Sequence, residues 1–284
     1  MLLDDDRPRD DGHGFGAALV WALRRGATSL SVVTGRGSAI IARRAGEFAL
    51  PIAVWTVDGT ELRPAVGEPA GLEVPADALH LDLIPAIEAA GATAVVEHGV
   101  VSGEVRGLEV CRVVTASDDP SVIRLEVGIG AHDREAFGLL HADVPPGEAL
   151  ARVVAAIAAY RDPRAAGHAL NRLVPERLLR WRLAEQPDAL GLAELRAVAP
   201  PVPRPGLKER TACTALGRRP DGTEVLVVTS VGVDLDVIPY AADARLDYGG
   251  DAETIVVAPA RDLVAATREL NAALRRPVAL VPAP

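Results

Sequence analysis

Side chains that could do chemistry gather first in a polar segment that follows a short apolar run. His132, Asp133, Arg134 and Glu135 stand in succession just after Gly130. An imidazole beside a carboxylate can serve as a general base, and functional groups often sit where a strand ends. A solvated turn, or a helix that starts with Asp133 as its cap, would use the same residues. The segment is a candidate binding site, and we assign no catalytic residue.

A second polar segment follows a later apolar run and contains Asp234, Asp236 and Tyr240. In an extended chain the two aspartates would point to the same side, and close carboxylates suit Mg²⁺ or Ca²⁺. Acidic residues two positions apart are also common by chance, so we assign no metal and no cofactor. Asn171 and Arg172 lie between the two polar segments. We expect all these residues to line one cleft between two domains, where ligands often bind.

Apolar periodicity and turn residues predict the elements that would position these side chains. In the first half, a helix is expected near the N-terminus, and the residues after Gly37 suit either a second strand or the start of a helix. Asp58-Gly59 predicts a hairpin. The predicted elements are a helix over 14–25, strands over 29–34 and 38–42, a hairpin over 52–63, a helix over 79–91, strands over 93–97, 100–105, 108–114 and 121–127, and a helix over 148–160.

The second half begins with helical periodicity over 164–198 and a proline-rich segment over 199–206, which is typical of a stiff connector. Strands are predicted over 211–217, 223–230, 254–258 and 277–281, and a helix over 261–274. Cys111 and Cys213 each fall on the first strand of a strand–loop–strand–polar turn–helix series. We interpret the two series as an internal duplication, although short apolar strands also look alike by chance.

These patterns predict an α/β (α+β) protein with two similar domains, each a mixed, mostly antiparallel sheet with packed helices. The predicted organisation is a flexible acidic tail over 1–12, an N-terminal domain over 13–162, a helical connector and linker over 163–206, and a C-terminal domain over 207–284.

Composition limits the classes of partner. The chain has 284 residues, a formal charge of −9 and 3% aromatic residues. Few aromatic rings, and eight acids against one arginine over 221–253, argue against nucleic acid. No apolar run reaches the ~20 residues of a membrane span, and the acidic N-terminus does not resemble a signal peptide. We expect a cytoplasmic protein with free cysteines that does not act at membranes.

The charge contrast also suggests a docking surface. Residues 161–184 carry six arginines and two acids. We hypothesise that Arg177 and Arg180 dock this segment onto the acidic stretch 221–253, within one chain or across a homodimer, since opposite charges favour such contacts. A homodimer is the expected assembly.

The order of Glu104 and Glu109 loosely resembles a restriction-endonuclease-like core. That chemistry needs a lysine one residue beyond the second acid, and here Val110 and Cys111 follow Glu109. A degenerate nuclease of this type is therefore the least favoured of the functions considered.

Three segments carry a broader resemblance: 125–136 (LEVGIGAHDREA), 170–177 (LNRLVPER) and 232–245 (GVDLDVIPYAADAR). With them, the chain is similar over most of its length to a conserved actinobacterial protein family of unknown function. The resemblance implies a cytosolic protein of high-GC Gram-positive bacteria and transfers no activity.

We therefore expect a non-catalytic regulatory or scaffolding protein that binds through the inter-domain cleft or a homodimer surface and takes a small-molecule ligand. The alternative is an enzyme that acts on a small polar metabolite in that cleft, with His132 as its base.

Overall fold

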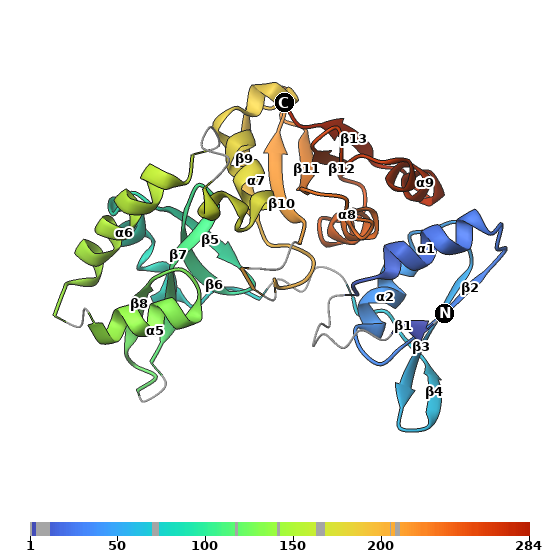
Figure 1. Ribbon diagram of the computed structural model, residues 1–284, viewed down its shortest axis with the longest axis horizontal. Coiled ribbons are helices and arrows are strands. Elements are labelled where there is room, and N and C mark those ends of the chain that lie inside the picture. The colour runs from blue at the N-terminus through green and yellow to red at the C-terminus, as the bar shows by residue number, and fades with distance from the viewer. Residues whose placement is uncertain are drawn as a thin grey trace.

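The computed structural model describes residues 2–3, 12–69, 74–116, 119–140, 143–162, 168–204, 206–207 and 211–284. Three β-sheets and the helices packed on them follow one another along the chain (Figure 1). The predicted mixed α/β class is confirmed. Most of the predicted acidic tail lies outside the described residues, although Leu2–Leu3 pairs with the first sheet as strand β1.

The N-terminal unit is a four-stranded sheet with two helices. Strands β1, β2 and β3 are parallel, and β4 returns antiparallel through the predicted Asp58-Gly59 turn. Gly37 adopts a left-handed conformation (φ 60°) and starts a helix, which decides between the two alternatives for this segment. The elements are β1, α1 (Phe15–Arg24), β2 (Leu30–Thr34), α2 (Ser38–Ala45), β3 (Ile52–Asp58) and β4 (Glu61–Pro64).

The middle unit is an antiparallel meander in the order β5-β6-β7-β8. Its strands match the four predicted ones, and Pro85 divides the predicted helix over 79–91 into two short helices. The elements are α3 (Ala78–Leu81), α4 (Ile84–Ala89), β5 (Thr93–Glu97), β6 (Val100–Val105), β7 (Leu108–Thr115), β8 (Ile123–Val127), α5 (Ala131–Leu140) and α6 (Pro146–Tyr160).

The C-terminal unit is a five-stranded sheet in the order β13-β12-β11-β10-β9. Its strands β11, β12 and β13 are parallel, whereas β9, β10 and β11 are antiparallel. The elements are η1 (Ala169–Arg172), α7 (Pro175–Glu185), η2 (Pro187–Leu190), β9 (Glu194–Val198), β10 (Cys213–Arg218), β11 (Glu224–Thr229), α8 (Val237–Asp247), β12 (Glu253–Ala258), α9 (Ala265–Ala273) and β13 (Ala279–Pro282).

The predicted duplication is not confirmed. Cys111 and Cys213 do lie on strands, but the meander around β7 and the mixed sheet around β10 have different strand orders. "Mostly antiparallel" describes the middle sheet only. A different pair of segments shares one path: β1-α1-β2-α2-β3 and β11-α8-β12-α9-β13 each place three parallel strands in sequence order.

These two segments pack against each other through their helices. An isolated antiparallel bridge joins Phe48, just after α2, to Leu274, just after α9. Phe15, Leu19 and Phe48 share one apolar core with residues of α8, α9 and one face of the C-terminal sheet. The middle unit has a separate core, and α7 covers the other face of the C-terminal sheet with Leu179 and Leu183. The predicted two-domain division therefore does not follow the cores.

Candidate functional site

The first predicted polar segment lies on the surface of the middle unit as the first turn of α5. His132, Asp133 and Glu135 are exposed, and Asp133 accepts a hydrogen bond from the Ile129 N–H at 2.6 Å. Arg134 is buried and donates to Glu109 Oε1 at 2.9 Å. This segment is therefore the start of a helix, which is one of the alternatives that the sequence allowed. The side chain of Asp133 stabilises the turn that precedes this helix.

The second polar segment binds the N-terminus of helix α1 in the N-terminal unit. Asp236 accepts hydrogen bonds from the Gly14 and Gly16 N–H groups at 2.8 and 2.7 Å, and His13 Nδ1 lies 3.2 Å away. Burial would raise the pKa of Asp236, but His13 and the two backbone N–H groups outweigh burial and lower it. Asp236 thus caps the positive N-terminus of α1 from a distant part of the chain.

Asp234 lies in the same turn, where one of its carboxylate oxygens accepts from the Asp236 N–H at 2.8 Å. Burial and the charge of Asp236 raise the pKa of Asp234 to about 6. The two aspartates would point to one side if residues 234–236 were extended, but Asp236 has a helical conformation (φ −80°, ψ −9°) and α8 begins directly after it. Tyr240 lies in the core, 4% exposed, and its hydroxyl has no hydrogen-bond partner in the described chain.

The predicted residues do not form one site. The α5 segment lies in the left part of the molecule, whereas α8 lies to the right of its centre, beside α1 (Figure 1). Asn171 donates to the Asp162 carbonyl at 2.8 Å and lines a separate pocket, whereas Arg172 is exposed. The expected shared cleft between the polar segments is therefore absent from the described structure.

A buried ion cluster instead joins the middle and C-terminal units. It consists of Glu97 on β5, Glu104 on β6, and Arg177 and Arg180 on α7, each at most 13% exposed. Arg177 binds both glutamates, and Arg180 donates to Glu97 at 3.0 Å, to Glu104 at 3.3 Å and to the Thr214 carbonyl of β10 at 3.1 Å. We call these four residues the central ion cluster.

The charges in the central ion cluster balance. Burial alone would raise the pKa of Glu104, but Arg177 and Arg180 outweigh it and hold that pKa below its usual value. Burial would likewise lower the pKa values of both arginines, and Glu104 and Glu97 raise them instead. Glu104 therefore stays ionised at neutral pH. The helix α7 does pack on β11, within the acidic stretch 221–253, but the expected ion pairs are not those of Arg177 and Arg180, whose carboxylate partners belong to the middle unit.

Next to the central ion cluster, a pocket of about 530 Å³ separates β5 from β9. Among the described strands both lie at an edge, because β5 pairs only with β6 and β9 only with β10. We call this pocket the edge groove. One wall is residues 93–96, the opposite wall is residues 195–199, and Arg180, Trp181 and Ala184 of α7 line it as well.

The pairing of the two strands shows which backbone groups face the edge groove. Glu97 and Val100 flank a two-residue turn, so their peptide groups form hydrogen bonds with each other. Because hydrogen-bonded and non-hydrogen-bonded pairs alternate along the two strands, the N–H and C=O groups of Ala94 and Val96 point away from β6. On the other side of the groove, the Arg219 N–H donates to the Thr223 carbonyl of the neighbouring strand segment. The same alternation, followed through β10 to β9, makes the peptide groups of Leu195 and Ala197 point away from β10. These four peptide groups form no hydrogen bond with a backbone group of the described residues.

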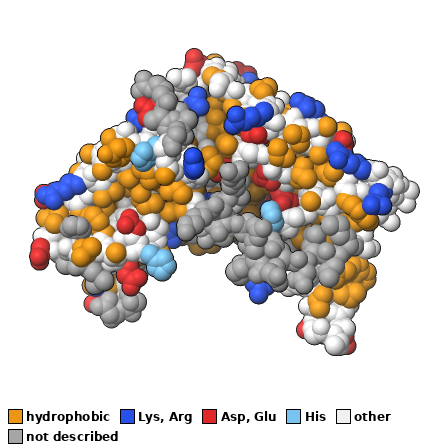
Figure 2. Space-filling model, viewed as in Figure 1, with side chains coloured by type: hydrophobic (Ala, Val, Ile, Leu, Met, Phe, Trp, Pro, Cys, Tyr) orange, Lys and Arg blue, Asp and Glu red, His pale blue; other side chains and the backbone are white. Residues whose placement is uncertain are grey.

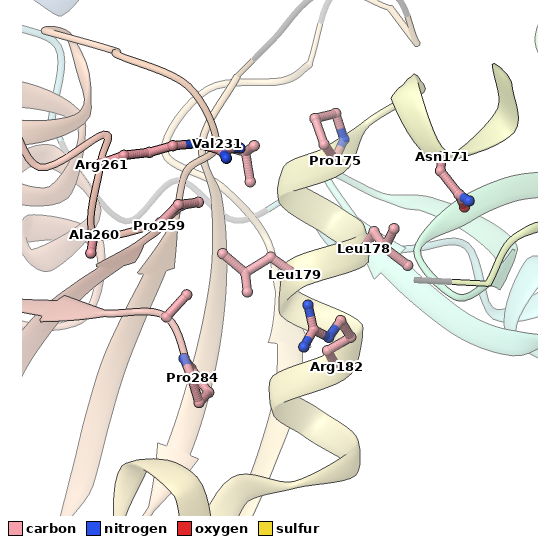
Figure 3. Close-up of a pocket in the computed structure, with 11 residues that line it drawn as sticks. Asn171, Pro175, Leu178, Leu179, Arg182, Val231, Pro259, Ala260, Arg261 and Pro284 are labelled. Carbon is pink, nitrogen blue, oxygen red and sulfur yellow. The ribbon is translucent and has the colours of Figure 1, made fainter. Parts of the chain in front are cut away.

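A second pocket, of about 480 Å³, lies between α7 and the carboxyl ends of the parallel strands β11, β12 and β13 (Figure 3). We call it the strand-end pocket. Leu178 and Leu179 line it from α7, and Val231 and Pro259 line it from the loops after β11 and β12. Figure 3 shows the guanidinium of Arg182 beside Leu178 and Leu179, with Arg261 on the opposite wall.

Sequence reasoning missed the edge groove and most of the strand-end pocket. The segment holding β9 was predicted helical, so its free edge was hidden. Arg182 and Arg261 belong to a chain rich in arginine, and nothing local distinguishes them. The parallel order of β11, β12 and β13 would have identified the strand-end pocket, because ligands commonly bind at the carboxyl ends of parallel strands.

We compared the chain with protein-family models, with curated proteins and with solved structures, and none of the three comparisons gave a match. In the described part of the chain, no helix has the length and apolar character needed to cross a bilayer. Across the same residues, no three His, Cys, Asp or Glu side chains gather as a metal site would require. On the face seen in Figure 2, the described arginines are scattered over the units.

Proposed function

We propose that the chain is a non-catalytic binding protein that takes an extended segment of a partner polypeptide into the edge groove. The observation that carries this proposal is the outward direction of four peptide groups, at Ala94, Val96, Leu195 and Ala197, from two strands that face each other. An extended chain offers N–H and C=O groups on both of its sides. Cα atoms of β5 and β9 approach within 8 Å of each other, whereas two strands on either side of a third would lie about 10 Å apart. A bound strand would therefore pair with one of the two edges, which is recognition by strand addition.

The walls of the edge groove indicate what such a segment would carry. Trp181, Ala184 and Leu195 offer apolar contacts on the α7 side. Arg196 is exposed and has no carboxylate partner in the described chain, whereas the charge of Glu104 is neutralised by arginines. We therefore expect a β-forming partner segment with alternating apolar residues and at least one carboxylate for Arg196.

The contacts of the described residues do not support either enzyme hypothesis, the metabolite enzyme with His132 as its base or the nuclease with Glu104 and Glu109. His132 is exposed and is bound to no carboxylate of the described residues. Glu104 is paired with Arg177 and Arg180, and Glu109 with Arg112 and Arg134, so neither carboxylate of the nuclease hypothesis is open to a metal ion. The homodimer stays a prediction that analytical ultracentrifugation would test.

The test selects ligands for the full chain from a phage-displayed library of random decapeptides. One selected peptide is then measured against Ala94→Pro and Ala197→Pro variants, which remove outward N–H groups without removing a ladder hydrogen bond. One of the two variants should weaken binding about tenfold or more, since two or three backbone hydrogen bonds depend on the edge that the peptide pairs with. Hydrogen exchange measured by NMR should show the outward amides of that edge protected only in the complex.

Leu62→Pro is the matched control. Leu62 lies at an equivalent outward position of β4, an edge strand of the N-terminal sheet. Peptide affinity should not change in this variant. Peptides that bind all three proline variants as tightly as the original chain, or a selection that returns no peptide dependent on the groove, would contradict strand addition.

A further inference from the structure

The strand-end pocket is distinct from the edge groove and has the composition of a small-molecule site. Its walls are mainly apolar, with Leu178, Leu179, Val231 and Pro259 among them, and its volume of about 480 Å³ lies within the usual range for ligand pockets. A few polar groups in an apolar pocket normally fix the orientation of the ligand. Among the described side chains that line this pocket, the ionised ones are both cationic.

These cations are Arg182 of α7 and Arg261 of the loop after β12, on opposite walls. Arg182 is exposed and is engaged by no acid in the described chain. Arg261 is 84% exposed, with Asp262 Oδ1 3.8 Å from its Nε. The other carboxylate oxygen of Asp262 is occupied, because it accepts from the Gly232 N–H at 2.8 Å. Both guanidinium groups can therefore turn toward a ligand.

We infer that the strand-end pocket binds an organic anion with an apolar body, such as a carboxylate on an aliphatic chain. A guanidinium presents two parallel N–H donors that match the two oxygens of a carboxylate or phosphate. Leu178, Leu179 and Val231 would cover the apolar body. An inorganic anion would leave these walls bare, and a neutral apolar molecule would leave both arginines unused.

Isothermal titration calorimetry on the full chain can separate these three classes with octanoate, octanol and inorganic phosphate as probes. We expect octanoate to bind more tightly than either of the other two. Exchanging both cations in Arg182→Gln/Arg261→Gln should weaken octanoate binding about tenfold or more. Ala260→Trp, at an exposed lining position, should abolish binding by filling the pocket.

Arg268→Gln is the matched control, since Arg268 is an exposed arginine of α9 outside the pocket lining. It should bind octanoate as the original chain does, and so should Ala197→Pro, which separates this pocket from the proposed function. Equal affinity for octanoate and octanol, unchanged affinity in the double arginine variant, or no octanoate binding at millimolar concentration would overturn the inference.

Discussion

The C-terminal unit contacts its two neighbours in opposite ways. Toward the N-terminal unit, helices α8 and α9 pack on α1 and α2 over a continuous apolar core, and fully buried Asp243 binds Arg43 and Arg44. Toward the middle unit, the contact is made by the central ion cluster, beside an open groove. We call these contacts the N-terminal joint and the middle joint.

The difference follows from how sheets meet. In the N-terminal joint the helices cover the faces of both sheets, so side chains provide most of the contact. Backbone groups also cross this joint, where Phe48 bridges Leu274 and where the Gly14 and Gly16 N–H groups donate to Asp236. In the middle joint two sheets approach by their edges, where backbone groups that point outward need partners. Ion pairs on α7 hold the two edges near each other without pairing them. The molecule is closed at one joint and has unpaired strand edges at the other, where we propose that a ligand strand binds.

Among the variants that test this comparison, Asp243→Ala in the N-terminal joint should cause the largest loss of stability. Its carboxylate accepts from Arg43 Nε at 2.5 Å and from Arg44 Nε at 2.9 Å. Removing it leaves two buried cations without their carboxylate, so the free energy of unfolding should fall by about 3–5 kcal/mol. Urea unfolding followed by circular dichroism measures the loss. Glu269→Ala, which removes an exposed partner of Arg24, should lower the free energy of unfolding far less, because exposed ion pairs contribute little to stability.

Glu104→Gln tests the middle joint. The variant keeps the size of the side chain but removes one of two negative charges that face Arg177 and Arg180. Glu97 still holds both arginines, so we expect a smaller loss of about 1.5–3 kcal/mol, the range for hydrogen bonds to charged groups. Glu148→Gln, at an exposed pair with Arg152, is the control and should change little. A loss as large as that of Asp243→Ala would mean that the two joints do not differ in this way.

Local sequence patterns predicted most elements but failed where tertiary contacts decide. The α8 segment has no polar face, because residues 237–245 are all buried, so its helical periodicity was invisible. The β9 segment, Glu-Leu-Arg-Ala-Val, favours a helix by residue type, and only its pairing with β10 makes it a strand.

The candidate sites show the same limit. Glu97 and Arg177 are 80 positions apart, and no local pattern connects them. The outward groups of β5 and β9 depend on which strand is paired and which is not, which is a property of the whole sheet. The polar residues near Asp133 and Asp236 were found from sequence, but their structural roles at helix starts are common for such residues.

Gly16→Ala examines how closely the N-terminal joint is packed. A Cβ at Gly16 would stand 2.1 Å from the Leu235 carbonyl oxygen, which belongs to the opposite unit. The helix α1 must therefore shift, at a cost of about 1–3 kcal/mol. Gly138→Ala in α5 meets nothing within 4 Å and should stabilise by up to about 1 kcal/mol, as alanine does in a helix. Thermal unfolding should move in opposite directions for the two variants, and equal shifts would contradict close packing at α1.

The smallest expected effect is a pH dependence confined to the N-terminal joint. Burial and Asp236 raise the pKa of Asp234 to about 6, so the folded chain holds a proton there that the unfolded chain releases near pH 4. This carboxyl therefore lowers stability as the pH rises from 4 to 6. Asp234→Asn keeps the oxygen that accepts from the Asp236 N–H, and it should stabilise the folded chain above pH 6 and leave its stability unchanged below pH 4.

Asp236→Asn should behave in the opposite way, because the pKa of Asp236 is lowered and its charge stabilises the folded state. That variant should be destabilised at neutral pH, and its deficit should shrink as the pH falls through the lowered pKa. Urea titrations at pH 2.5, 4, 6 and 7.5 measure both variants side by side. If both shifted stability in the same direction at pH 7.5, Asp236 would not be the partner that raises the pKa of Asp234, and the capping of α1 would not be an ionic contact.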